Sequence, residues 1–93
     1  MYIRVGRSRI DPARIDEDST LAHDIAEAFR QLPGFQNLTI GLDRGTGRSV
    51  NVSTYDTEEH ARWTPTRSDL NSRLQALGIQ MDPPEFFEVT TQA

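Results

Sequence analysis

Alternation of apolar and polar side chains marks the start of the chain. Over residues 2–10, Ile3 and Val5 fall on one face of an extended backbone, and Arg4 and Ser8 fall on the other. Proline cannot donate a hydrogen bond to a neighbouring strand, so Asp11-Pro12 ends the run. The pattern predicts a first strand.

A helical pattern comes next, over residues 16–32. Its apolar side chains recur at steps of three and four residues: Leu21, Ile25, Ala28, Phe29 and Leu32. The start is acidic, which suits the positive end of a helix dipole, and Ser19 or Asp16 is a possible N-cap. Pro33-Gly34 is expected to end this amphipathic helix.

Two further alternating runs are separated by turn residues. The first covers residues 35–43, and the second extends through Val50 and Val52 to Tyr55. The segment Arg44-Gly45-Thr46-Gly47 between them has two glycines able to adopt positive φ. These runs predict a β-hairpin.

The remaining residues predict a second helical region and a last strand. Asp56-Thr57-Glu58-Glu59 is typical of a capped helix start, and Pro65 interrupts this helix soon after it begins. A helical stretch is then expected over about residues 68–77, with Gly78 as its C-cap. After Pro83-Pro84, alternation over residues 86–91 predicts a closing strand.

The order strand, helix, strand, strand, helix, strand predicts one α+β domain spanning residues 1–93. Its plan is the ferredoxin-like split β-α-β fold, a four-stranded antiparallel sheet with two helices on one face. We expect the helices to cover the aliphatic face: Ile3, Val5, Leu38, Ile40, Val50 and Val52. A chain of 93 residues buries only a little over ~60% of its unfolded surface. A homodimer through the other sheet face is therefore expected.

Charge and composition narrow the possible partners. The formal net charge is −4, the cations are ten arginines without a lysine, and no basic stripe exists to bind nucleic acid. No apolar run approaches the ~20 residues of a membrane-spanning helix. The chain lacks cysteine, and its N-terminus does not resemble a secretory signal, which fits a cytoplasmic protein.

Three segments resemble the antibiotic biosynthesis monooxygenase group of the dimeric α+β barrel superfamily. They are Asp11-Pro12-Ala13-Arg14, Leu32-Pro33-Gly34-Phe35 and Ser53-Thr54-Tyr55-Asp56-Thr57-Glu58-Glu59-His60-Ala61. The resemblance implies that two sheets pack face to face into a barrel, with a pocket in each subunit between sheet and helices. The same architecture hosts oxygenases, isomerases and ligand sensors, so the resemblance does not fix the chemistry.

The haem-degrading members of this superfamily fit the sequence poorly. They resemble one another in an asparagine on the first strand, where this chain offers Gly6 or Ser8, and in a histidine downstream, whereas no histidine follows His60. Trp63 partly matches the tryptophan that those members have early in the second helix. Neither His60 nor His23 has ligand partners at metal-binding spacing. We expect no cofactor and no metal.

His60 and Tyr55 are the candidate catalytic residues, since an imidazole titrates near the pH at which a general base works. The competing interpretation makes His60 a solvated residue of a first helical turn. His23, beside the apolar stripe of the first helix, is expected at the surface.

Trp63, Asn51 and Arg4 are the candidate substrate-binding residues. Trp63 is placed to roof a pocket for a flat aromatic molecule, or simply packs. Asn51 and Arg4 share a sheet face, where they either polarise an oxygenated ligand or form the dimer contact, with Arg4 paired to Glu88. The contact interpretation is the favoured one.

Together with these candidate residues, the resemblance implies a cofactor-independent monooxygenase acting on an aromatic or polyketide-like metabolite. The alternative is a non-catalytic dimeric module that binds a small molecule or has a structural role, because the sequence contains no matched set of nucleophile, base and acid. Isomerase or lyase chemistry on a similar fold is a third possibility.

Overall fold

The computed structural model describes residues 1–63 and 68–93. Its elements in chain order are β1 (Tyr2–Arg9), the 3-10 helix η1 (Pro12–Arg14), α1 (Leu21–Arg30), β2 (Phe35–Leu42), β3 (Arg48–Tyr55), α2 (Glu58–Ala61), α3 (Ser68–Ala76), β4 (Gln80–Met81) and β5 (Glu85–Glu88). The expected ferredoxin-like α+β fold is confirmed.

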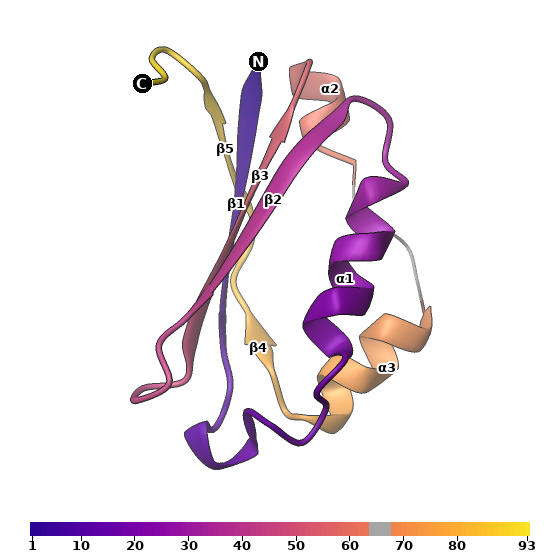
Figure 1. Cartoon of the computed structure of the whole chain (residues 1–93), viewed down its shortest axis with the longest axis vertical. Coiled ribbons are helices and arrows are strands. Elements are labelled where there is room, and N and C mark those ends of the chain that lie inside the picture. The colour runs from indigo at the N-terminus through magenta and orange to yellow at the C-terminus, as the bar shows by residue number, and fades with distance from the viewer. Residues whose placement is uncertain (64–67) are drawn as a thin grey trace.

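One antiparallel sheet forms one side of the molecule, on the left in Figure 1. Strand β1 lies at its centre, paired along its length with β3, which in turn pairs with β2. On its other side β1 pairs with β4 near Arg9 and with β5 near Tyr2. The sheet thus has five strands where four were expected, because the two-residue strand β4 precedes the Pro83-Pro84 break.

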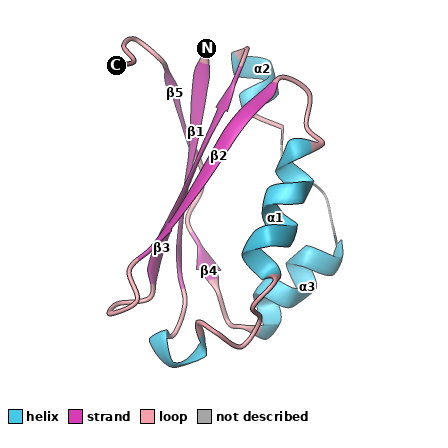
Figure 2. Ribbon diagram, viewed as in Figure 1, coloured by secondary structure: helices cyan, strands magenta, loops and turns pink. Residues whose placement is uncertain are grey.

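The helices α1, α2 and α3 all lie on the same side of the sheet (Figure 2). The face that they cover is opposite to the expected one along β1 and β3. Arg4 lies opposite Ser53, and Gly6 lies opposite Asn51. These residues face the helices, as do Ile40 and Leu42 of β2, which line one cavity together with side chains of α1 and α3.

Ile3, Val5, Val50 and Val52 therefore point away from the helices. Cross-strand partners share a face, and the register pairs Val5 with Val52. Phe87 of β5 lies opposite Ile3 on the same side and is 48% exposed. We call the five residues Ile3, Val5, Val50, Val52 and Phe87 the open apolar face.

Of the expected starts of the first two helices, the second is confirmed and the first is not. Helix α1 begins at Leu21, and its N-cap is Thr20, without a side-chain cap hydrogen bond, so neither Asp16 nor Ser19 caps it. Helix α2 has the expected capped start: it is a single turn capped by Thr57, whose hydroxyl accepts from the His60 backbone N–H at 3.2 Å. The expected break at Pro65 lies outside the described residues.

Two apolar clusters lie between the layers. One joins Ile10 to α1 and α3 through Leu21, Ala28, Leu70 and Leu77. The other, at the opposite end, surrounds Tyr55 with Phe29 and Ala61 and is flanked by side chains including Phe35 and Phe86. Within the described residues no helix is both long enough and apolar enough to cross a membrane.

Candidate functional site

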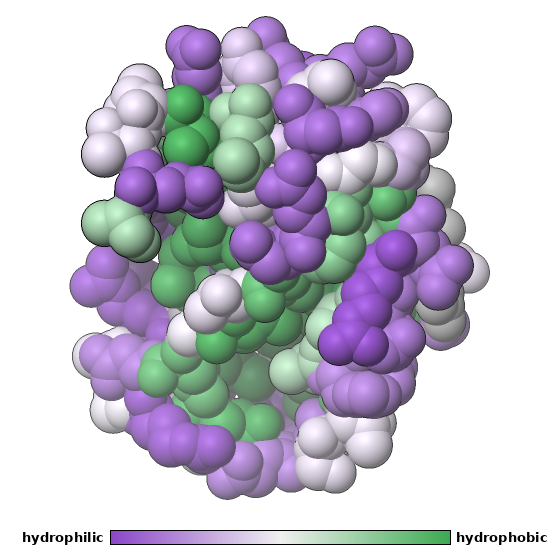
Figure 3. Space-filling model, turned by 45° about the horizontal axis from the view of Figure 1, so that its top comes forward, coloured by the Kyte–Doolittle hydropathy of each residue, from purple (hydrophilic) through white to green (hydrophobic). Residues whose placement is uncertain are grey.

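A cavity of about 500 Å³ lies between the sheet and helices α1 and α3. Figure 3 shows apolar side chains gathered around a hollow on this side of the molecule. The helices contribute its apolar wall: Leu21, Ile25, Ala28, Phe29, Leu70 and Leu74. Such a volume and lining suit a small ligand with a large apolar part.

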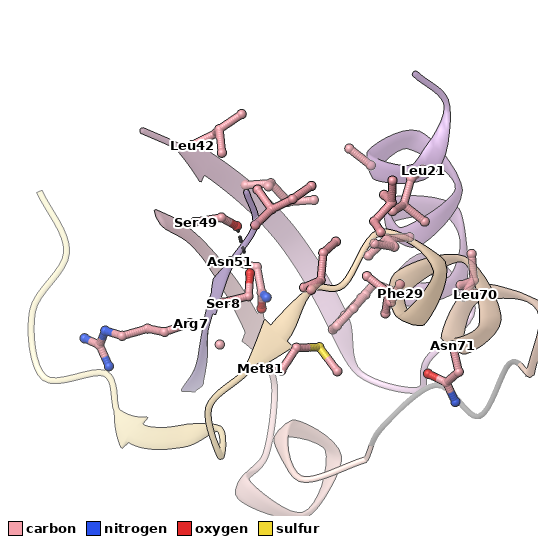
Figure 4. Close-up of a pocket in the computed structure, with 18 of the residues that line it drawn as sticks. Arg7, Ser8, Leu21, Phe29, Leu42, Ser49, Asn51, Leu70, Asn71 and Met81 are labelled. Atoms are coloured by element: carbon pink, nitrogen blue, oxygen red, sulfur yellow. Dashed lines mark hydrogen bonds between the residues drawn. The ribbon is translucent and has the colours of Figure 1, made fainter. Parts of the chain in front are cut away.

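The sheet contributes a polar floor to this cavity, seen in Figure 4. The Ser8 hydroxyl donates to the Ser49 hydroxyl at 3.2 Å. Asn51 lies beside this pair, and Phe29 and Leu70 face it from the helices (Figure 4). The polar floor consists of Arg4, Ser8, Ser49 and Asn51, all from β1 and β3.

Gly6 makes room for the Asn51 carboxamide. A Cβ atom added at Gly6 would lie 2.6 Å from Asn51 Nδ2 and 2.8 Å from Asn51 Oδ1. The carboxamide therefore rests on the bare backbone of β1. Among the described residues its oxygen and nitrogen have no hydrogen-bond partner, so both are available to a ligand.

Arg4 is 8% exposed and lines the cavity. Its Nη1 donates to the backbone carbonyl of Trp63 at 2.8 Å, and its guanidinium carbon lies 5.8 Å from the Phe86 ring centroid. Burial lowers the pKa of this guanidinium, and the arginine still keeps its charge at any physiological pH. A cation thus stands at the wall of a largely apolar space.

Tyr55 and Ser53 lie beyond Arg4, outside the cavity lining. Both residues are 0% exposed, and neither hydroxyl has a hydrogen-bond partner of acceptable geometry. Burial raises the pKa of the Tyr55 phenol, and the nearby Ser53 hydroxyl and Arg4 charge partly oppose the rise. Tyr55 therefore keeps its proton and is a better donor than a base.

His60 lies on α2, also outside the cavity lining. Its Nδ1 is 2.6 Å from Asp56 Oδ1, and the hydrogen bond from His60 lowers the pKa of Asp56. The His60 ring packs edge-on against Trp63, with 6.0 Å between centroids. A side chain at Gly34, whose φ is +70°, would collide with both members of the Asp56–His60 pair.

The structure therefore splits the predicted site residues into two groups. Arg4 and Asn51 meet at the cavity, whereas His60, Tyr55 and Trp63 lie towards α2. Trp63 is 49% exposed and forms no part of the lining, and His23 is exposed on α1 as expected. In the described part of the chain, no three His, Asp or Glu side chains are grouped closely enough to hold a metal ion.

The sequence alone did not point to the clamp that Arg73 forms beside the cavity. Arg73 of α3 donates to Asp18 and to Asp24, each at 2.6 Å. The hydrogen bond from Arg73 lowers the pKa of Asp18, which itself lines the cavity. Arg73 thus ties α3 to α1 and to the segment before it, over 49 and 55 residues of separation, which no local pattern reveals.

A sheet with helices on one side and a cavity between the layers defines a class of small pocket proteins, the ferredoxin-like α+β domains. Comparisons with known proteins narrow this class of fold further. No protein-family model matches the sequence, and no curated protein does. Solved structures, in contrast, match over nearly the whole chain.

The chain is similar to a proposed antibiotic biosynthesis monooxygenase from Deinococcus radiodurans, with 17% identity over 100% of this chain and 96% of that one, at a TM-score of 0.77. SnoaB, a cofactor-independent oxygenase from Streptomyces nogalater, is 20% identical over 98% of this chain and 94% of that one, at a TM-score of 0.72. ActVA-Orf6, a Streptomyces coelicolor monooxygenase whose structure contains nanaomycin D, is 24% identical over 99% of this chain and 88% of that one, at a TM-score of 0.66. The chain therefore has the fold of antibiotic biosynthesis monooxygenases.

Proposed function

We propose that this protein is a cofactor-independent monooxygenase acting on an aromatic or polyketide-like metabolite. The carrying observation is the cavity of about 500 Å³, with an apolar wall above a polar floor. Its lining suits a mostly apolar molecule with oxygen substituents. The structural likeness to a cofactor-independent oxygenase supports the same assignment.

In this proposal the reactivity resides in the substrate. An anthrone-type compound carries a CH₂ group between two aromatic rings, and loss of one proton gives an electron-rich carbanion conjugated with the carbonyl. The carbanion reduces O₂ and forms a carbon–oxygen bond. The resulting hydroperoxide loses water, so CH₂ plus O₂ becomes C=O plus H₂O, and the removed proton returns with the water.

Asn51 and Arg4 are the residues that we place at the substrate. The Asn51 carboxamide would donate to the carbonyl oxygen on which charge develops, and Arg4 would add its positive charge at the wall. The helices surround the site with apolar side chains, which strengthens both interactions. His60 and Tyr55 lie outside the lining, so a catalytic role for them would not involve contact with a substrate bound in this cavity.

The proposal includes a homodimer through the open apolar face. Its aliphatic residues cover the side of the sheet that no helix protects, and Phe87 is 48% exposed there. The ion pair between Arg7 and Glu85 and the arginines Arg9 and Arg48 lie around it. An apolar centre with a polar rim is the usual build of a subunit interface.

Oxygen uptake with dithranol, an anthrone, tests the function. The wild type should consume O₂ at a rate unchanged by EDTA, above the rate of the buffer. Asn51→Ala should lower kcat/KM by about a hundredfold, the usual effect of removing one donor to a developing oxyanion. His23→Gln, on the exposed side of α1, is the matched control and should retain the full rate.

A ligand-binding module is the second candidate, and one observation favours it. The lining contains no histidine, and of its two carboxylates, Asp18 and Asp82, the first is paired with Arg73. A module would retain a small molecule through purification, visible by native mass spectrometry, without O₂ uptake on any anthrone. Uptake that is abolished by Asn51→Ala would exclude this candidate.

A further inference from the structure

Met81 brings a sulfur atom to the edge of the cavity. It is the second residue of the edge strand β4, and its cross-strand partner on β1 is Ser8 of the polar floor. Cross-strand partners share a face, so the Met81 side chain lies on the helix side of the sheet, and it contributes to the cavity lining. Figure 4 shows it directed to the side on which Phe29 and Leu70 lie, whereas Arg7 points the other way.

The Met81 side chain is also open to solvent. It is 63% exposed, the highest value of any large apolar side chain in the described residues. A dissolved oxidant therefore reaches its thioether without any opening of the fold. The proposed homodimer leaves it accessible, because the open apolar face is on the other side of the sheet. The chain's other methionine, Met1, is 44% exposed and lies outside the cavity lining.

Oxidation changes the character of this part of the cavity wall. A thioether is apolar, whereas a sulfoxide is polar and carries an oxygen that accepts hydrogen bonds. A sulfoxide that an apolar ligand covers loses hydrogen bonds to water and gains none from the ligand. Met81 belongs to neither apolar cluster, so its oxidation leaves the packing of the core in place. The consequence of oxidation therefore falls on ligand binding.

We propose that Met81 is a site of reversible oxidation, at which a hydroperoxide lowers the affinity of the cavity for apolar ligands. The sulfur gives two electrons to the outer peroxide oxygen, so the O–O bond breaks and the S=O bond forms. The hydroxyl proton passes to the departing alkoxide, which leaves as an alcohol. This inference rests on the proposed function only in taking the cavity as the ligand site. It goes beyond that function in giving the cavity a redox-sensitive wall.

Protection by a bound ligand tests the placement of Met81. The probe is 1-aminoanthracene, a neutral tricyclic aromatic molecule, and the oxidant is tert-butyl hydroperoxide. Peptide mass spectrometry gives the rate of sulfoxide formation at Met81 and at Met1 in the same sample. Saturating probe should slow the oxidation of Met81 by about threefold or more, because it covers part of the exposed sulfur, and should leave the Met1 rate unchanged.

Fluorescence titration with the same probe tests the consequence. The oxidised wild type should bind it about three- to tenfold more weakly than the untreated protein, since one partly exposed side chain changes from apolar to polar. Methionine sulfoxide reductase should restore the affinity. Met81→Leu keeps an apolar side chain of similar volume without the sulfur, so it should bind like the untreated wild type before and after peroxide. Met81→Gln, polar and of similar length, should bind weakly without any peroxide.

Four results would each overturn the inference: no binding of the probe to the untreated protein, equal slowing of oxidation at both methionines or at neither, unchanged affinity once Met81 is fully oxidised, or an equal loss of affinity in Met81→Leu. Neither measurement uses oxygen uptake or an anthrone. Binding that peroxide weakens in a protein without O₂ consumption would support the Met81 site while refuting the monooxygenase. Oxygen uptake by a protein whose binding is indifferent to peroxide would do the reverse.

Discussion

The two faces of the sheet carry the reverse of what hydrophobicity predicts: polar side chains lie under the helices and apolar side chains lie on the face without helices. The face under the helices carries the polar residues Arg4, Asn51 and Ser53, whereas the face without helices carries Val5 and Val52. On the covered side the helices supply the apolar surface, so the sheet can carry polar side chains there. On the open side the sheet itself is apolar, and this surface is the one that we propose as the homodimer interface.

Breaking the open apolar face should have the largest effect. Val52→Asp puts a charge in the middle of the proposed interface, twice per dimer because of the two-fold symmetry. We expect the dimer dissociation constant to rise by at least about a hundredfold, since a buried unpaired charge costs several kcal/mol. Sedimentation velocity at micromolar concentration measures it.

Ser72→Asp, which adds the same charge to an exposed position of α3, should leave the dimer intact. A wild-type chain that sediments as a monomer at micromolar concentration would refute the interface. So would a Val52→Asp variant that dimerises as tightly as the wild type.

Disturbing the polar floor should have the next largest effect. Gly6→Ala places a methyl group 2.6 Å from Asn51 Nδ2, so the carboxamide must move. We expect kcat/KM for dithranol to fall by about tenfold or more, because displaced donors no longer meet the developing oxyanion. Gly41→Ala meets only Val50, at 3.4 Å, and should retain the wild-type rate. Equal rates for the two variants would place the reaction elsewhere.

These faces also show what the sequence does and does not predict. Alternation locates β1, β2 and β3 to within a residue or two, because a period of two is a local property of the backbone. It cannot tell which set of side chains faces the helices. Hydrophobicity alone assigns Ile3 and Val50 to the covered face, and the helices pack on the other one.

The candidate site is predicted in part for the same reason. Arg4 and Asn51 stand out in the sequence as polar residues on a shared face, and the register places them near each other. His60 is a candidate for its chemistry and its nearness in sequence to Tyr55, which does not bring it to the cavity. The partners of Arg73 are distant in the chain, so only the fold could reveal them.

The clamp beside the cavity gives a smaller, pH-dependent effect. The folded pKa of Asp18 is lowered by Arg73, so its contribution to stability is present above the unfolded value of 3.8 and is lost as the pH falls through the folded pKa. Arg73→Gln should lower the Tm at pH 7 by a few degrees. Between pH 4 and pH 2 the Tm of this variant should also fall by less than the Tm of the wild type does. Calorimetry across this range tests it, with Arg30→Gln, an exposed i,i+3 pair on α1, as the control.

The smallest effect concerns the phenol of Tyr55 under the polar floor. Burial raises its pKa above 10.0, so the unfolded chain loses this proton at a lower pH than the folded protein does. Unfolding then releases a proton, and stability falls as the pH rises from about 10 towards the folded pKa. Tyr55→Phe should flatten this alkaline decline, measured by urea unfolding between pH 8 and pH 11.

At pH 7 the same variant should be as stable as the wild type or slightly more so, because it removes a hydroxyl that has no partner. A loss of more than about 1 kcal/mol at pH 7 would mean that the hydroxyl is already satisfied in the unliganded protein.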